Sequence, residues 1–226
     1  MNRLAFDEEI GKLEHDVLDM ASRAEAMVAR AVEALQKLDQ GIAREVMLAD
    51  DEIDELDLHI EAQCLRLLAL QQPIARDLRT VGTAMKIITD IERIGDLAVD
   101  IAKIGMKIDA EGGSADHVDI PKIAKVARQM VRESLEAFVR RDTSHLEQIA
   151  RMEDEVDELY RELRNQIHDF MRTHPDQVVS ASWLLLAVHH IERIADHALN
   201  IAERVGFMVT GELEQITASH RSDEPL

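Results

Sequence analysis

Two versions of one stretch decide the fold: DIERIGDLAVDIA at residues 90–102 and HIERIADHALNIA at residues 190–202. In both, apolar residues recur three and four positions apart, which is the spacing of one face of an α-helix. The acids of the first stretch, Glu92, Asp96 and Asp100, are four positions apart and therefore also share a face. Stacked like charges repel by roughly 0.2–0.5 kcal/mol per pair, so we expect them to hold something cationic.

The repetition extends well beyond these stretches. Residues 28–59 align with residues 131–162 with 9 identities in 32 positions, and residues 88–104 align with residues 188–204 with 8 identities in 17. The offset changes from 103 to 100 between the two aligned blocks, which places the length difference in a loop. The sequence therefore predicts two copies of one unit of about 100 residues.

Amphipathic periodicity predicts three long helices in each copy. The first copy has helices at about 3–38, 42–71 and 76–109, and the second has helices at about 120–140, 143–172 and 177–211. Short connections make consecutive helices antiparallel neighbours. We predict an all-α fold of two tandem, internally duplicated antiparallel three-helix bundles, with the first bundle at 1–110, a linker at 111–118, the second bundle at 119–211 and a polar tail at 212–226.

Composition excludes several classes of partner. The net charge of −19 disfavours nucleic acid and anionic lipid, because both are bound mainly through Lys and Arg. Cys64 is the single cysteine, which fits a reducing compartment. We expect no signal peptide, and the longest uncharged run, residues 177–191, is too short for a transmembrane segment. These features predict a cytoplasmic protein.

The second helix of each copy also carries acids, and helical geometry divides them. An outward set, with Asp51 and Glu55 in the first copy and Asp154 and Glu158 in the second, should be solvated. The other set lies on one flank of the apolar seam, as Asp50, Asp54 and Asp57, and as Glu153 and Asp157. In an antiparallel pair, we expect Asp50 and Asp54 to face Glu92 and Asp96, and Glu153 and Asp157 to face Glu192 and Asp196; Asp100 drifts outward.

Clusters of carboxylate oxygen suit hard or borderline cations such as Mg, Mn, Ca or ferric iron, whereas structural zinc favours Cys and His. The alternative is a solvated helix face whose charges are paired by Arg93 or Arg193. Recurrence on matching flanks of both copies favours a metal site. His189 and His190 have no counterpart in the first copy, where Thr89 and Asp90 occupy these positions, so they are not counted as ligands.

Together with QQPIARDLRTVGTAMKI at residues 71–87, the paired acid motifs and both ERI-G/A-D stretches resemble the PhoU family over residues 3–211. The resemblance implies a cytoplasmic all-α negative regulator of phosphate uptake and of the phosphate-starvation response. It implies partners at the inner membrane face, namely the ATPase subunit of a phosphate ABC transporter and a sensor histidine kinase. We also expect a homodimer.

The resemblance further implies multinuclear metal binding through E/D-x-x-x-D motifs, with Fe, Mn or Mg as the favoured ions. Asn200 departs from the acid at Asp100, and Tyr160 replaces Asp57, so the second copy should bind fewer or weaker ions. The implied ligands are Asp50, Asp54, Glu92, Asp96 and Asp100 in the first copy and Glu153, Asp157, Glu192, Asp196 and Asn200 in the second.

Two other functions compete with a non-enzymatic regulator and adaptor. A ferritin-like di-metal enzyme would use Glu-x-x-His pairs, but none of the ten histidines has Glu three positions before it. A purely structural helical adaptor would show no metal-dependent stabilisation. No Ser/His/Asp arrangement, Gly-rich phosphate loop or activated cysteine indicates catalysis, so we predict that the protein is not an enzyme.

Overall fold

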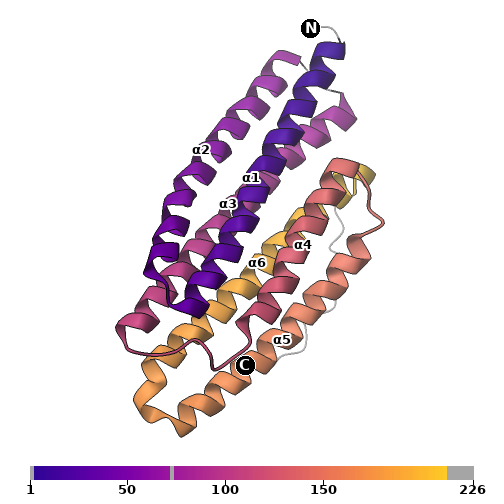
Figure 1. Ribbon diagram of the computed structural model, residues 1–226. Helices are drawn as coiled ribbons and strands as arrows, with labels where there is room; N and C mark the ends of the chain where they lie inside the picture. The colour runs from indigo at the N-terminus through magenta and orange to yellow at the C-terminus, as the bar shows by residue number, and fades with distance from the viewer. Residues whose placement is uncertain (1–2, 72–73, 213–226) are drawn as a thin grey trace.

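The computed structural model describes residues 3–71 and 74–212, and in this part of the chain every long element is an α-helix. The prediction of an all-α fold is confirmed. Lobe 1 consists of α1–α3 and lobe 2 of α4–α6 (Figure 1). The helices are α1 (Arg3–Lys37), α2 (Gln40–Gln71), α3 (Ala75–Ala110), α4 (Ile120–Arg140), α5 (Leu146–Thr173) and α6 (Val178–Thr210), with a short 3₁₀ turn, η1 (Pro175–Gln177), before α6.

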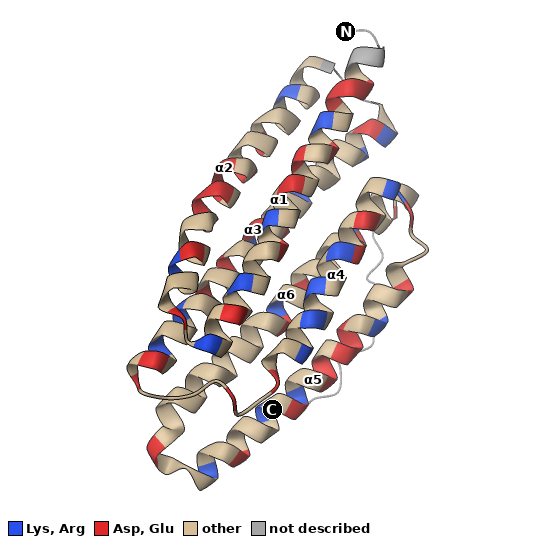
Figure 2. Ribbon diagram, viewed as in Figure 1, with Lys and Arg blue, Asp and Glu red and all other residues tan. Residues whose placement is uncertain are grey.

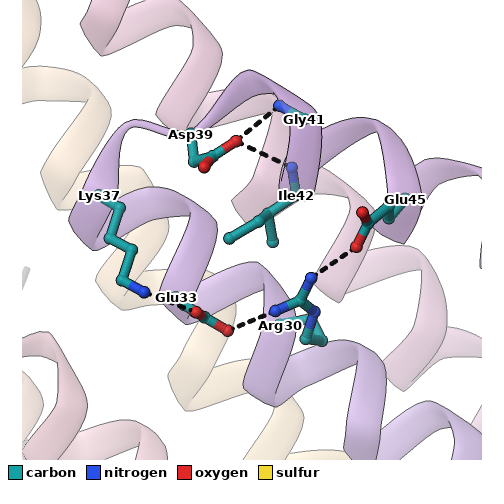
Figure 3. Close-up of polar contacts among 7 residues, drawn as sticks. All are labelled: Arg30, Glu33, Lys37, Asp39, Gly41, Ile42 and Glu45. Carbon is teal, nitrogen blue, oxygen red and sulfur yellow. Dashed lines mark hydrogen bonds and ion pairs between the residues drawn. The ribbon is translucent and has the colours of Figure 1, made fainter.

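The same turn ends the first helix of each lobe. Leu38 follows α1 with φ 51° and Arg141 follows α4 with φ 53°, so both occupy the left-handed region that closes a helix C-terminus. The next residue is aspartate in both lobes. Asp39 Oδ1 accepts hydrogen bonds from the backbone N–H groups of Gly41 and Ile42, which starts α2 (Figure 3). The duplicated sequence therefore produces a duplicated helix hairpin.

Ion pairs cross the α1–α2 hairpin on its outer side. Arg30 contacts Glu33 one turn along α1 at 2.7 Å and Glu45 on α2 at 2.5 Å, and Lys37 contacts Glu33 at 2.8 Å (Figure 3). These side chains are exposed or half-exposed, so each pair contributes only about 0–1 kcal/mol. Apolar packing, rather than these pairs, must hold α1 against α2.

The helices share one continuous core instead of forming two separate ones. The buried apolar side chains of all six helices belong to a single cluster, and the α3–α6 contact is the most extensive between any two helices. The equivalent pair α1–α4 also packs together, while α2 and α5 lie at opposite outer edges (Figure 1). We call the α3–α6 contact the seam. The two bundles are therefore fused along their third helices.

The seam explains why α3 and α6 are apolar on more than one side. Helix α5 buries a single stripe at Ile149, Val156, Leu159, Leu163 and Ile167. Helix α3 buries two faces: one carries Val81, Ile88, Ile91, Ala98 and Ala102, and the other carries Ile87, Ile94, Leu97, Ile101 and Ile104. A helix that is apolar nearly all round must be covered on more than one side, and the partner lobe supplies that cover.

The segment between α3 and α4 is tied to both helices. Gly112 has φ 65°, a conformation that favours glycine, and Gly113 N–H donates to Ile108 O at 2.9 Å. Asp119 caps α4 by accepting from Lys122 N–H. The expected polar tail at 212–226 lies outside the described residues except for Glu212. No helix within residues 3–71 and 74–212 has the length and apolar content needed to cross a membrane.

Candidate metal-binding edges of the two lobes

Acids of α2 and α3 meet along one border of lobe 1. We call this group the lobe 1 edge, and it comprises Asp50, Asp54, Asp57, Glu92 and Asp96. Asp50 lies directly against Gly95: a Cβ atom placed on that glycine would be 3.4 Å from Asp50 Oδ1. Partial burial, followed by the negative charges of Asp54 and Asp96, raises the pKa of Asp50. The predicted facing of the two acid motifs is therefore present in the structure.

Burial and neighbouring negative charges also raise the pKa values of Glu92 and Asp57 in the lobe 1 edge. Burial raises the pKa of Glu92, and the charges of Asp96, Asp57 and Asp54 raise it further. The pKa of Asp57 is raised by burial and then by Glu61 and Asp54. Arg93 relieves part of this repulsion, because it lies 2.8 Å from Asp96 and 3.4 Å from Glu92. More than half of the Arg93 side chain is exposed, at 56%, so these ion pairs are weak.

The lobe 2 edge comprises Glu153, Asp157, Glu192 and Asp196, and burial affects its carboxylates more strongly than those of lobe 1. Burial raises the pKa of Glu192 to about 7, with further contributions from Asp196, Asp157 and Glu153. Asp196 keeps an exposed side, yet the protein packed around it and the charge of Asp157 raise its pKa as well. The second predicted pairing of motifs, between α5 and α6, is therefore also present.

His189 is a neighbour of the lobe 2 edge that comparison of the two repeats does not predict. Its Nδ1 lies 3.2 Å from Glu192 Oε2, although in the described part of the chain neither atom makes a hydrogen bond. The rings of His189 and Tyr160 are 6.1 Å apart, and Tyr160 occupies the position of Asp57 in lobe 1. Lobe 2 thus replaces one carboxylate with an aromatic–imidazole pair. In the sequence, the spacing of three positions between His189 and Glu192 already indicates that the two side chains lie one helical turn apart on the same face.

Asp100 and Asn200 do not join the edge of their own lobe. Asn200 Nδ2 lies 3.5 Å from Asp90 Oδ1 across the seam, and His197 Nδ1 lies 2.9 Å from the same oxygen. Asp100 in turn faces His190, and its charge partly offsets the burial that lowers the pKa of His190. Asp100 and Asn200 therefore point away from the edges of their own lobes, as the outward position expected for Asp100 suggests. Their side chains instead contact residues of the other lobe across the seam.

The outward acids are exposed, as predicted. Asp51 and Glu55 on α2 and Asp154 and Glu158 on α5 all belong to the solvent-facing side of their helices. Glu158 is 71% exposed and pairs with Arg161 at 3.1 Å. Figure 2 shows acids along α2 and α5 and a run of basic residues along α4. The two edges differ from these exposed acids because their motifs face a second helix.

The family is decided by the match of each lobe to one family model. That model is described as the PhoU domain, and it matches residues 17–105 and 120–205. The chain belongs to the PhoU family.

Full-length relatives agree with this membership. A Clostridium acetobutylicum protein is 35% identical over 94% of this chain and 97% of its own length, and a Deinococcus radiodurans protein is 33% identical over 94% and 100%. Both are named phosphate-specific transport system accessory protein PhoU homolog. The crystal structure of PhoU from Pseudomonas aeruginosa superposes with a TM-score of 0.87 at 34% identity, covering 92% of this chain and 100% of that one.

The edges of this PhoU-family chain fit an oxygen-seeking cation in the kind of donor that they offer. Carboxylates from two helices face one another, and Glu192 Oε2 is buried without a hydrogen bond among the described residues. Between residues 3–71 and 74–212, however, no three His, Cys, Asp or Glu side chains are already arranged to hold a metal ion. Binding would therefore require the Asp and Glu side chains to change rotamer and turn their oxygens toward a common point.

The raised pKa of Glu192 predicts a pH-dependent effect in the metal-free protein. Below pH 4.5 the group is protonated in both folded and unfolded chains and costs nothing. Between 4.5 and about 7 only the unfolded chain ionises, so the folded state is progressively penalised. The shift corresponds to about 3 kcal/mol, reduced to about 1–2 kcal/mol by solvent screening. Glu192→Gln should therefore stabilise the protein by about 1–2 kcal/mol at pH 8 and have little effect at pH 4.

Urea unfolding in the presence of a chelator measures this difference across the pH range. The exposed Glu155 on the same lobe is the matched control. Glu155→Gln should give the same small change in unfolding free energy at both pH values. A Glu192→Gln variant that is destabilised at pH 8 would contradict the electrostatic account of the lobe 2 edge.

Proposed function

We propose that this protein is a cytoplasmic accessory protein of a phosphate transport system and a negative regulator of the phosphate-starvation response. It acts as an adaptor between the ATPase subunit of the phosphate ABC transporter and a sensor histidine kinase at the inner membrane face. The observation that carries this proposal is the match of both lobes to the PhoU domain, supported by nearly full-length relatives named as accessory proteins of phosphate-specific transport.

The chemistry of the chain supports an adaptor rather than an enzyme. Within residues 3–71 and 74–212, the acids that face one another across two helices form two similar edges on the borders of the helix bundles, and this placement suits paired binding sites better than one catalytic pocket. The ferritin-like alternative needs Glu-x-x-His pairs on two helices, whereas the nearest approach here is the reversed His189-x-x-Glu192 on one helix. The adaptor function therefore remains favoured over that enzyme.

As part of this proposal, both edges bind cations, with Fe, Mn or Mg as the favoured ions. The physical support is that burial, and then the repulsion of neighbouring acids, raises the pKa values of Asp50, Glu92 and Glu192, because a bound cation would offset this cost of the charged form. Lobe 2 should bind more weakly, because Tyr160 replaces an acid there. A purely structural adaptor would lack this dependence on metal.

We also propose that the protein forms a homodimer. Helix α2 lies at an outer edge of the molecule (Figure 1), and its exposed side carries Leu58 and Leu65, which are 65% and 51% exposed. These residues are seven positions apart, which is the sequence repeat of apolar residues in paired helices of a coiled coil. Covering them with a second copy would remove apolar surface from water.

Deletion of the gene tests the regulatory proposal. Phosphate-scavenging genes should be expressed in the deletion strain even when phosphate is abundant, because the restraint on the sensor kinase is lost. Transcript levels in phosphate-replete medium provide the measurement, and a plasmid copy of the wild-type gene should restore repression. Unchanged transcript levels would contradict the proposal. A pull-down from phosphate-replete cells should recover the transporter ATPase and the kinase.

A further inference from the structure

Three arginines converge on a small pocket between the lobes, away from both edges. The pocket has a volume of about 180 Å³ and is bounded by the beginning of α3 and the ends of α4 and α6. These helix ends lie at the same end of the molecule (Figure 1). We call it the arginine pocket, and its lining residues are Arg76, Arg79, Thr80, Arg141, Met208 and Val209.

Two of the arginines are held in place by contacts to other elements. Arg79 Nε donates to Met208 O at 3.1 Å, so the guanidinium caps the C-terminus of α6. Arg141, in the left-handed position after α4, pairs with Glu14 of α1 at 2.8 Å. Arg141 and Glu14 are 27% and 21% exposed, which makes this pair more protected from water than most ion pairs of the molecule. The arrangement is therefore fixed by helices of both lobes.

The pocket has hydrogen-bond donors and positive charge to spare. Each guanidinium carries five N–H donors, and Arg79 and Arg141 each use one nitrogen in the contacts described above. Arg76 is exposed on the first turn of α3. Glu14 pairs with Arg141, and the buried acid Asp77 lies on the first turn of α3 next to Arg76, so three positive charges accompany these two carboxylates. This excess is local, in a chain whose net charge is −19.

The internal duplication shows that these arginines are not part of the repeated pattern. At the offset of 100, Arg76 and Arg79 correspond to Asp176 and Val179. At the offset of 103, Arg141 corresponds to Leu38, which makes the same left-handed turn without a charge. In the other repeat, the position equivalent to each arginine thus holds a residue without positive charge. The three arginines are therefore particular to this end of the molecule, where the start of α3 meets the ends of α4 and α6.

We propose that the arginine pocket binds inorganic phosphate as a tetrahedral oxyanion. Guanidinium groups match the paired oxygens of phosphate with bidentate hydrogen bonds. The volume is below the roughly 300–1,000 Å³ of pockets for drug-sized ligands, so a free oxyanion fits better than a nucleotide. The choice of phosphate among oxyanions rests on the proposed function. Because Arg76 and Arg79 belong to lobe 1 and Arg141 to lobe 2, a bound phosphate would bridge the lobes.

Calorimetric titration of the purified full chain with potassium phosphate at low ionic strength tests the site. Wild type should bind one phosphate per chain saturably. Arg76→Gln should weaken binding roughly tenfold to a hundredfold, the loss expected for a hydrogen-bonded charge, and Arg76→Lys should restore part of it. The matched control is Arg44→Gln, which removes one exposed positive charge from α2. Sulfate should compete with phosphate, whereas chloride at equal ionic strength should not.

The outcomes separate this site from the regulatory proposal. Weaker phosphate binding in Arg76→Gln, with unchanged binding in Arg44→Gln, supports the arginine pocket as the phosphate site. Absence of saturable binding, equal loss in Arg44→Gln, or competition by chloride overturns it. If phosphate binding fails in any of these ways while gene deletion still activates phosphate-scavenging genes, the pocket assignment is wrong and the regulatory function stands.

Discussion

Replacing Glu92 with Gln and Asp96 with Asn is expected to abolish the cation-dependent stabilisation of lobe 1 and to leave that of lobe 2 intact. In the metal-free protein, partial burial and then the negative charges of neighbouring acids raise the pKa values of Asp50 and Glu92 at the lobe 1 edge. A cation that binds only the folded chain stabilises it by about 2.7 kcal/mol per site when its free concentration is a hundredfold above Kd. The double variant should lose about that amount, with one metal site fewer in a Mn²⁺ titration.

The outward acids provide the control for this experiment. The double substitution Asp51→Asn with Glu55→Gln also removes two negative charges, but from the exposed side of α2. It should therefore change neither the number of bound ions nor the metal-dependent shift of the melting temperature. Equal loss of metal in both double variants would mean that the edges are ordinary solvated faces. The same conclusion would follow if wild type showed no metal-dependent shift. The regulatory proposal would survive either result.

Replacing Gly105 with valine is expected to lower the free energy of unfolding by about 3 kcal/mol, at the upper end of the range for overpacking. A Cβ atom at this position would be 3.0 Å from Leu35 Cα, 3.4 Å from Leu35 N and 3.5 Å from Ala34 O. All three atoms belong to the α1 backbone and cannot move aside by a change of rotamer. Valine would therefore force α1 away from α3 and open the core of lobe 1. Chemical denaturation measures the loss.

A second glycine of α3 supplies the matched control. At Gly95, an added Cβ would be 3.4 Å from Asp50 Oδ1 and 3.5 Å from Ile53 Cγ2, which is ordinary contact with movable side chains. The corresponding residue of lobe 2 is Ala195. Gly95→Ala should therefore leave stability unchanged or raise it by up to about 1 kcal/mol through helix propensity. A Gly105→Val variant as stable as Gly95→Ala would contradict the close approach of α1 and α3.

The helices could be predicted because their signals are local. Asp39 marks the first turn, and the apolar spacing of α5 marks one buried stripe. Predicted and observed helix ends differ by at most three residues, the largest difference being the start of α5 at Leu146 instead of 143. There Asp142 caps the turn by accepting from Ser144 N–H, which delays the helix. The facing of the acid motifs followed from helical period and antiparallel packing.

The seam could not be predicted, because periodicity within one helix does not reveal which distant helix covers it. The family resemblance implied that Asp100 and Asn200 are ligands of their own lobes, and the fused packing of α3 on α6 instead directs Asn200 to Asp90 of the other lobe. His189 was discounted because lobe 1 has no histidine there. Repeat symmetry is a sound guide to the shared scaffold, but it fails where the two lobes have diverged.

Within the seam, contacts occur in equivalent pairs. Asp90 contacts Asn200, and His190 faces Asp100. Positions 90 and 190 are equivalent in the two repeats, as are positions 100 and 200, so the same pair of positions meets twice across the seam. The helix pairs α3–α6 and α1–α4 likewise join equivalent helices. This reciprocity is the defining property of an isologous two-fold interface. A lone three-helix unit would leave the second apolar face of α3 in water, so the unit is complete only when paired. The monomer has the internal symmetry of a dimer, its two subunits joined by the short connector between Ala110 and Ile120.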